Sequence, residues 1–195
     1  FMSTIAAIAT PPGGALGIIR ISGRDSIKIV NKFFRSKFKL KECQPQRIIF
    51  GEFLDKDGSL LDYVGVIVYR GPNSYTGEDM IEIVSHGGKV ILESILENIL
   101  NEGARLARPG EFTERRLLSG KINLIEAELI PDLVNAPTKE ALKSAAKNLG
   151  GMLSKAIKKL IDELIEIEAI IEYRINFPDE DEETHLPFER IKKIK

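Results

Sequence analysis

Two opposite charges stand inside segments that otherwise have the apolar pattern of β-strands. Arg20 interrupts the stretch 18–21, and Glu82 interrupts the stretch 80–84. Side chains alternate between the two faces of a strand, so each charge shares a face with apolar neighbours. A buried charge without a partner is costly. Two interpretations are therefore open. Arg20 and Glu82 form a purely structural cross-strand ion pair, or they line a pocket for a ligand with anionic and donor-rich ends.

Other motifs give weaker signals. Gly13-Gly14 and His86-Gly87-Gly88 permit close backbone approach, and the second precedes a predicted helix N-terminus that can hold an anion. Gly120-Lys121 resembles the end of a phosphate-binding loop. The Walker A pattern, however, needs glycine where Arg115 stands and serine or threonine where Ile122 stands. We therefore predict no nucleotide site here.

The composition excludes several classes of site. The chain has 195 residues, 43% of them apolar, a net charge of −1, two histidines and a single cysteine, Cys43. This rules out an internal disulfide and a Cys/His zinc site, and Cys43 has no nearby histidine to activate it. We predict no catalytic and no metal-binding residue. No apolar run approaches the ~20 residues of a membrane span, and no secretory signal is evident, so we expect a cytoplasmic protein without a membrane anchor.

Within residues 1–110 we expect strands and two helices, and these elements should position the candidate side chains. Short β-compatible segments are separated by Pro/Gly-rich or Asp-Gly turns, which predicts a hairpin around Asp57-Gly58. One helix should follow Asp25, whose side chain suits an N-cap, and another should follow Gly88. The predicted strands are 4–9, 15–22, 47–54, 61–69 and 79–85. This half is predicted to be α+β.

The pattern becomes helical after Pro109. We predict a short helix over 112–118, a second over 124–134 that Pro131 kinks or interrupts, and one long amphipathic helix from Leu142 to Ile171 that runs through Gly150-Gly151. A further helix should begin near Phe188. One apolar stripe cannot be stable without other helices to cover it, so we expect the chain to end inside a helical domain.

A series of motifs runs along nearly the whole chain. They are Thr4–Gly13, Gly17–Gly23, Ser74–Asp79, His86-Gly87-Gly88, Ala107–Thr113, Gly120-Lys121, Asp132-Leu133 and Phe177-Pro178-Asp179-Glu180. Taken together and in this order, they closely resemble the MnmE (TrmE) family of tRNA modification GTPases.

The resemblance implies a mixed sheet with helices like the tetrahydrofolate-binding domain of aminomethyltransferases, over residues 1–119, followed by part of an all-helical domain over 120–195. It implies binding of 5-formyltetrahydrofolate or 5,10-methylenetetrahydrofolate. The family's folate contacts fall on Arg20, Glu82 and Lys121. A carboxylate such as Glu82 suits the adjacent N–H and amine groups of a pterin, and a basic residue suits the anionic glutamate tail. This sequence departs from the family pattern at Arg116, where a small residue is usual.

The resemblance also implies partners and missing parts. Family members form homodimers through the N-terminal domain. With an FAD-dependent partner (MnmG, also called GidA) they form a heterotetramer that modifies the wobble uridine of certain tRNAs. The G domain, with its GTP, Mg²⁺ and K⁺, and the catalytic C-terminal cysteine motif lie beyond residue 195. Two alternatives remain, a free-standing folate-dependent enzyme of the aminomethyltransferase type and a structural dimerisation module.

Overall fold

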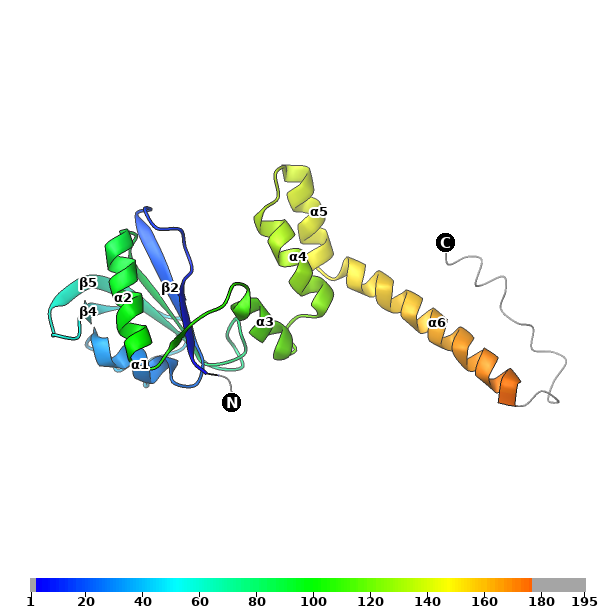
Figure 1. Ribbon diagram of the computed structural model, residues 1–195, viewed down its shortest axis with the longest axis horizontal. Helices are drawn as coiled ribbons and strands as arrows, with labels where there is room; N and C mark the ends of the chain where they lie inside the picture. Colours follow the sequence, from blue (N-terminus) through cyan, green and yellow to red (C-terminus); the bar gives the residue numbers. More distant parts are fainter. Residues whose placement is uncertain (1–2, 177–195) are drawn as a thin grey trace. The chain divides into compact units, whose positions relative to one another are not determined.

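The computed structural model describes residues 3–176 of the chain. Contacts between residues divide the chain into two compact units, Phe1–Ile122 and Asn123–Lys195 (Figure 1). We call them unit 1 and unit 2. The Phe177–Glu180 motif and the helix predicted from Phe188 lie outside the described residues. Within residues 3–176, none of the helices has the length and apolar character needed to cross a membrane.

Unit 1 is built on one mixed, seven-stranded sheet with the strand order β3-β4-β5-β6-β2-β1-β7. Neighbouring strands run antiparallel except β1 and β7, which are parallel. The strands are β1 (Ile5–Ile8), β2 (Leu16–Ser22), β3 (Phe34–Arg35), β4 (Ile48–Leu54), β5 (Leu60–Tyr69), β6 (Met80–His86) and β7 (Arg105–Leu106). This architecture confirms the predicted α+β class and the hairpin, which β4 and β5 form.

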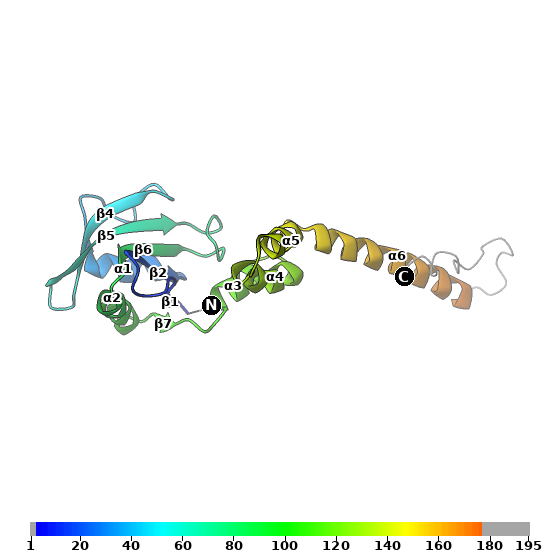
Figure 2. The same ribbon diagram turned by 90° about the horizontal axis from the view of Figure 1, so that it is seen from above.

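Two helices cover one face of the sheet, α1 (Ser26–Phe33) and α2 (Lys89–Asn101) (Figure 2). Alternate strand residues point toward these helices and form the core, because the period of a strand is two. Ile19 and Ile21 of β2 and Ile81 and Ile83 of β6 are fully buried in it. The residues between them, including Arg20 and Glu82, therefore lie on the opposite face, which we call the open face.

Two details of unit 1 differ from the predictions. The two-residue strands β3 and β7 were not predicted, because so short a segment carries no periodic pattern. Asp25 precedes α1 in the N-cap position, but its side chain makes no capping hydrogen bond. The backbone N–H of Asp25 instead donates to Thr4 Oγ1 at 3.1 Å. Unit 1 also contains α3 (Glu111–Leu118), close to the predicted bounds.

Unit 2 contains α4 (Leu124–Val134), α5 (Lys139–Leu149) and α6 (Met152–Asn176). The prediction of one long helix through Gly150-Gly151 was wrong. Gly150 caps α5, and Gly151 has a positive φ of 87°, which ends the helical hydrogen-bond pattern. By contrast, α4 continues through Pro131.

Candidate functional site

Arg20 and Glu82 face each other in the middle of the open face. The strand register places Ile48, Ile67, Glu82, Arg20 and Ala7 in one row across five strands. Arg20 Nη2 lies 2.7 Å from Glu82 Oε1, and Arg20 Nε donates to the same oxygen at 2.9 Å. Their side chains are 27% and 14% exposed. The structure thus brings together two of the three predicted ligand-binding residues.

Glu82 has a second donor on the neighbouring strand. The hydroxyl of Tyr69 donates to Glu82 Oε2 at 3.0 Å. Burial raises the pKa of Tyr69, and the adjacent Glu82 carboxylate raises it further. Tyr69 therefore stays protonated near neutral pH and keeps donating this hydrogen bond. Together, Arg20 and Tyr69 fix the orientation of the Glu82 carboxylate.

Arg20 is also held by aromatic rings at the edge of a pocket. Its guanidinium carbon lies 5.2 Å from the ring centroid of Tyr75 and 5.6 Å from that of Phe112, both within the range of cation–π contacts. Arg20, Tyr75 and Phe112 line a pocket of about 400 Å³ together with Ala7 of β1 and the 107–110 segment before α3. This volume lies within the usual range for small-molecule sites. The pocket offers a flat ligand an apolar wall beside a charged pair.

Residues 71–79 form a loop between β5 and β6, which we call the Tyr75 loop. A glycine turn places this loop against the end of α3. Gly77 has φ +82°, and a Cβ at this position would lie 2.7 Å from the Cβ of Ser119, so a larger residue would push the loop away. The hydroxyl of Tyr75 lies 3.2 Å from Thr113 Oγ1, which makes a second link between the loop and α3.

The C-terminus of α3 directs Lys121 back toward the same loop. Gly120 is left-handed, its N–H donates to Leu117 O, and the N–H of Lys121 donates to Arg116 O at 3.1 Å. This hydrogen-bond pattern is a Schellman motif. As a result, Lys121 Cε lies 3.6 Å from the position of a Cβ at Gly77. Lys121 thus lies beside the loop that carries Tyr75, but it makes no hydrogen bond or ion pair with Arg20 or Glu82.

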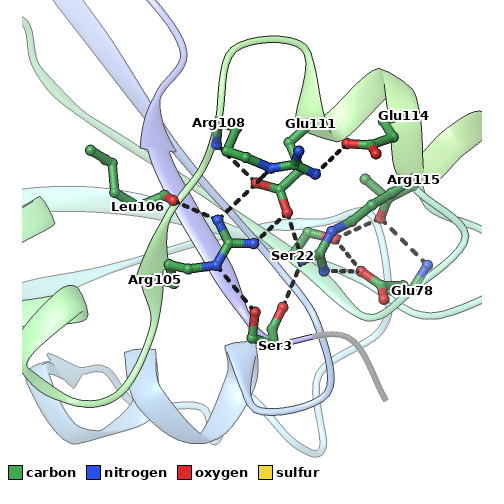
Figure 3. Close-up of polar contacts among 10 residues, drawn as sticks. Ser3, Ser22, Glu78, Arg105, Leu106, Arg108, Glu111, Glu114 and Arg115 are labelled. Atoms are coloured by element: carbon green, nitrogen blue, oxygen red, sulfur yellow. Dashed lines mark hydrogen bonds and ion pairs between the residues drawn. The ribbon is translucent and has the colours of Figure 1, made fainter.

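A buried ion-pair network anchors α3 to the sheet (Figure 3). The carboxylate of Glu111, which is 4% exposed, accepts hydrogen bonds from Arg105 Nη1 at 3.0 Å, from the Arg108 backbone N–H at 2.8 Å and from Arg115 Nη2 at 3.1 Å. The hydrogen bonds from Arg105 are the largest influence and, with those from Arg108 and Arg115, they lower the pKa of Glu111 to about 2. Glu111 is thus ionised over the physiological range.

Arg115 extends this network to the strands. Its guanidinium is 3% exposed and donates to Glu78 Oε2 at 2.8 Å and to the carbonyl oxygen of Ser3 at 2.7 Å. Ser22 at the end of β2 donates to the same Glu78 oxygen at 3.0 Å. The network therefore ties α3, the segment before β6 and the first strands together. It fixes the helix that carries Phe112 beside Arg20.

Sequence reasoning missed the residues that build the walls of the site. Tyr69, Tyr75 and Phe112 each contact Arg20 or Glu82. Tyr75 and Phe112 do occur in the motifs that carry the family resemblance, which was the only signal for them. No periodic pattern could have shown that α3 packs beside β2.

A larger hollow of about 800 Å³ lies elsewhere on unit 1, lined by residues between Lys37 and Phe50. Cys43 lines it, but burial and the nearby Glu42 carboxylate raise the pKa of this thiol. A raised pKa disfavours the thiolate that nucleophilic chemistry needs. The pocket lined by Arg20, with Glu82 paired to Arg20 beside it, is therefore the stronger candidate site.

Comparison with known proteins assigns both parts of the chain. Residues 4–121 match the family model described as GTP-binding protein TrmE N-terminus, and residues 124–195 match the MnmE helical domain. Proteins named tRNA modification GTPase MnmE are 44% identical over 100% of this chain in Thermotoga petrophila, 47% over 91% in Aquifex aeolicus and 43% over 97% in Clostridioides difficile. The matched parts make up 43%, 39% and 42% of those relatives. The chain thus spans about two fifths of their length.

Proposed function

Because the chain belongs to the MnmE family of tRNA modification GTPases, we propose that its unit 1 binds a reduced folate that carries a one-carbon group. Residues 1–119 are the folate-binding domain in this proposal, and residues 120–195 are the first part of the helical domain. Arg20, Glu82 and Lys121 are the proposed ligand-binding residues. When bound, the folate would supply a one-carbon unit at the formyl or methylene oxidation level.

The observation that carries this proposal is the oriented carboxylate of Glu82. Each oxygen of a carboxylate has two lone pairs, and here each oxygen accepts from one side chain, Arg20 at Oε1 and Tyr69 at Oε2. Oε2 therefore retains acceptor capacity, whereas two nitrogens of Arg20 already contact Oε1, and a ligand donor there would share that oxygen with Arg20. The adjacent N–H and amine of a pterin form a two-donor edge that such a carboxylate can accept as a charge-assisted pair.

The surroundings of the pair suit the rest of the ligand. Tyr75 and Phe112 line the pocket with aromatic surface that a flat heterocycle can contact, and Ala7, also in the lining, is a small residue. The side chains of Lys121 and Arg116 lie by the same loop and could meet an anionic tail. The donor set thus fits a reduced folate at both ends.

The competing interpretation is that Arg20 and Glu82 only stabilise the sheet. Titration of the chain with 5-formyltetrahydrofolate distinguishes the two. We expect binding heat for the wild type and its loss for Glu82→Gln, which keeps the shape but removes the charge. The matched control is Glu93→Gln on α2, whose side chain is 57% exposed. Absence of heat for the wild type, or equal affinity of Glu82→Gln and wild type, would reject the folate site.

We also propose that the chain forms a homodimer through unit 1. An apolar strip on the open face of the β4–β5 hairpin supports this, because Ile48, Phe50 and Tyr63 are 53%, 78% and 65% exposed. A second copy could cover this strip. Light scattering should give twice the chain mass for the wild type and a monomer for Phe50→Asp, with Val90→Asp on α2, whose valine is 75% exposed, as the control. A monomeric wild type at micromolar concentration would reject the dimer.

For the whole protein we propose the activity of the family. The parent would hydrolyse GTP in a G domain outside this chain, with Mg²⁺ and K⁺, and would act with an FAD-dependent partner (MnmG) on the wobble uridine of tRNA in the cytoplasm. On this proposal the chain alone is inactive. One-carbon transfer by the chain alone would favour the free-standing enzyme of the aminomethyltransferase type.

A further inference from the structure

Arg116 is a cation at the site that has no acidic partner among residues 3–176. Its guanidinium carbon lies 4.6 Å from the ring centroid of Tyr75, so this ring contacts both Arg116 and Arg20. Arg116 Nε is shielded from solvent and has no hydrogen-bond acceptor among the described residues. Arg116 follows Phe112 by four residues on α3 and therefore shares its face of the helix. Its charge is held beside the pocket, and none of the carboxylates in the described part of the chain neutralises it.

Lys121 is a second such cation. The Schellman motif that ends α3 brings it to Gly77, two residues beyond Tyr75, and no carboxylate within residues 3–176 forms an ion pair with it. Arg116 and Lys121 lie by the Tyr75 loop at the margin of the pocket, whereas the two basic residues that line the pocket, Arg20 and Arg108, are neutralised. Glu82 pairs with Arg20, and Glu114 pairs with Arg108. The unneutralised positive charge is thus concentrated where the Tyr75 loop meets the end of α3.

We propose that Arg116 and Lys121 bind the two carboxylates of the glutamate tail of the ligand, and that Arg116 makes the tail a major determinant of affinity. This inference rests on the proposed function, because it assumes that the ligand is a folate. Two free cations match a dianionic tail. Arg20 is engaged by Glu82 and so belongs to the pterin end. A guanidinium can also bind a carboxylate through two parallel hydrogen bonds, which an ammonium cannot do.

The test compares two ligands that differ only in the tail. The 195-residue chain is titrated calorimetrically with 5-formyltetrahydrofolate and with 5-formyltetrahydropteroate, which lacks the glutamate. We expect Arg116→Gln to weaken binding of the first ligand about tenfold and to change binding of the second by less than about twofold. Arg116→Lys should recover part of the loss because it restores the charge. Lys28→Gln on α1 removes an exposed charge away from the site and should change neither affinity.

The outcomes separate this inference from the proposed function. If the wild type binds neither ligand, the folate site fails, and this inference fails with it. If Glu82→Gln weakens both ligands but Arg116→Gln equals the wild type, the folate site stands and the role of Arg116 is refuted. Equal weakening of both ligands by Arg116→Gln would also refute it, because a general disturbance of the Tyr75 loop would then explain the loss.

Discussion

Removing the charge of Glu111 should destabilise unit 1 in a way that depends on pH. The pKa of this carboxyl falls from an ordinary value of 4.5 to about 2 in the folded chain, mainly through Arg105. A shift of this size corresponds to about 3 kcal/mol of stability. Because the folded pKa is the lower one, the stabilisation is present above about pH 4.5 and is lost as the pH falls toward 2. Glu111→Gln should therefore cost about 3 kcal/mol at neutral pH and less than about 1 kcal/mol at pH 2.5.

Urea unfolding of wild type and Glu111→Gln at these two pH values measures the difference. The NMR signals of isoleucine methyl groups in the core of unit 1 report on this unit separately from unit 2. Glu93→Gln is the matched control, because Glu93 is 57% exposed and forms an ion pair with Lys89 at 3.8 Å on the surface of α2, so it should change little at either pH. If Glu111→Gln cost the same free energy at both pH values, the ionised carboxylate would not be the source of the stabilisation.

Three further substitutions test the local geometry. Gly77→Ala should lower folate affinity at least several-fold in calorimetry, because its φ is +82° and the new Cβ would lie 2.7 Å from that of Ser119. Tyr69→Phe should lower the urea unfolding free energy of unit 1 by about 1 kcal/mol, since one Glu82 oxygen loses its donor. Gly151→Ala should destabilise the helices of unit 2 by about 1–2 kcal/mol in thermal unfolding followed by circular dichroism, because its φ of +87° is strained for alanine.

Each of these three substitutions has an outcome that would contradict its reasoning. Unchanged folate affinity for Gly77→Ala would mean that the Tyr75 loop does not shape the pocket. Unchanged stability for Tyr69→Phe would mean that its hydroxyl contributes nothing to holding Glu82. A Gly151→Ala variant as stable as wild type would mean that α5 and α6 can join without strain.

The alternation of apolar and polar residues predicted the strands of the sheet, because this pattern is a local property of the sequence. Alternation placed Arg20 and Glu82 in the middle of strands, and the cost of a buried charge predicted that each would need a partner. The ion pair at 2.7 Å has the geometry of that prediction. A structural pair and a ligand-binding pair both contain this contact, so binding measurements are needed to distinguish them.

The remaining features depend on contacts between distant segments. Phe112 reaches Arg20 only because the Glu111–Arg115 network anchors α3, and those residues are far from β2 in the sequence. The break between α5 and α6 was missed for a different reason. Glycine is tolerated within a helix at a cost of about 1 kcal/mol, and a continuous apolar stripe outweighed that cost in the prediction. In the structure, Gly151 adopts a left-handed backbone conformation, and the helical pattern stops there.

A crystal structure of the chain soaked with 5-formyltetrahydrofolate would show directly whether Glu82 binds the ligand. We expect the pterin edge to lie within hydrogen-bond distance of the Glu82 carboxylate, with its ring beside Tyr75 and Phe112. An empty pocket at saturating ligand, with Arg20 and Glu82 bonded only as they are here, would contradict it.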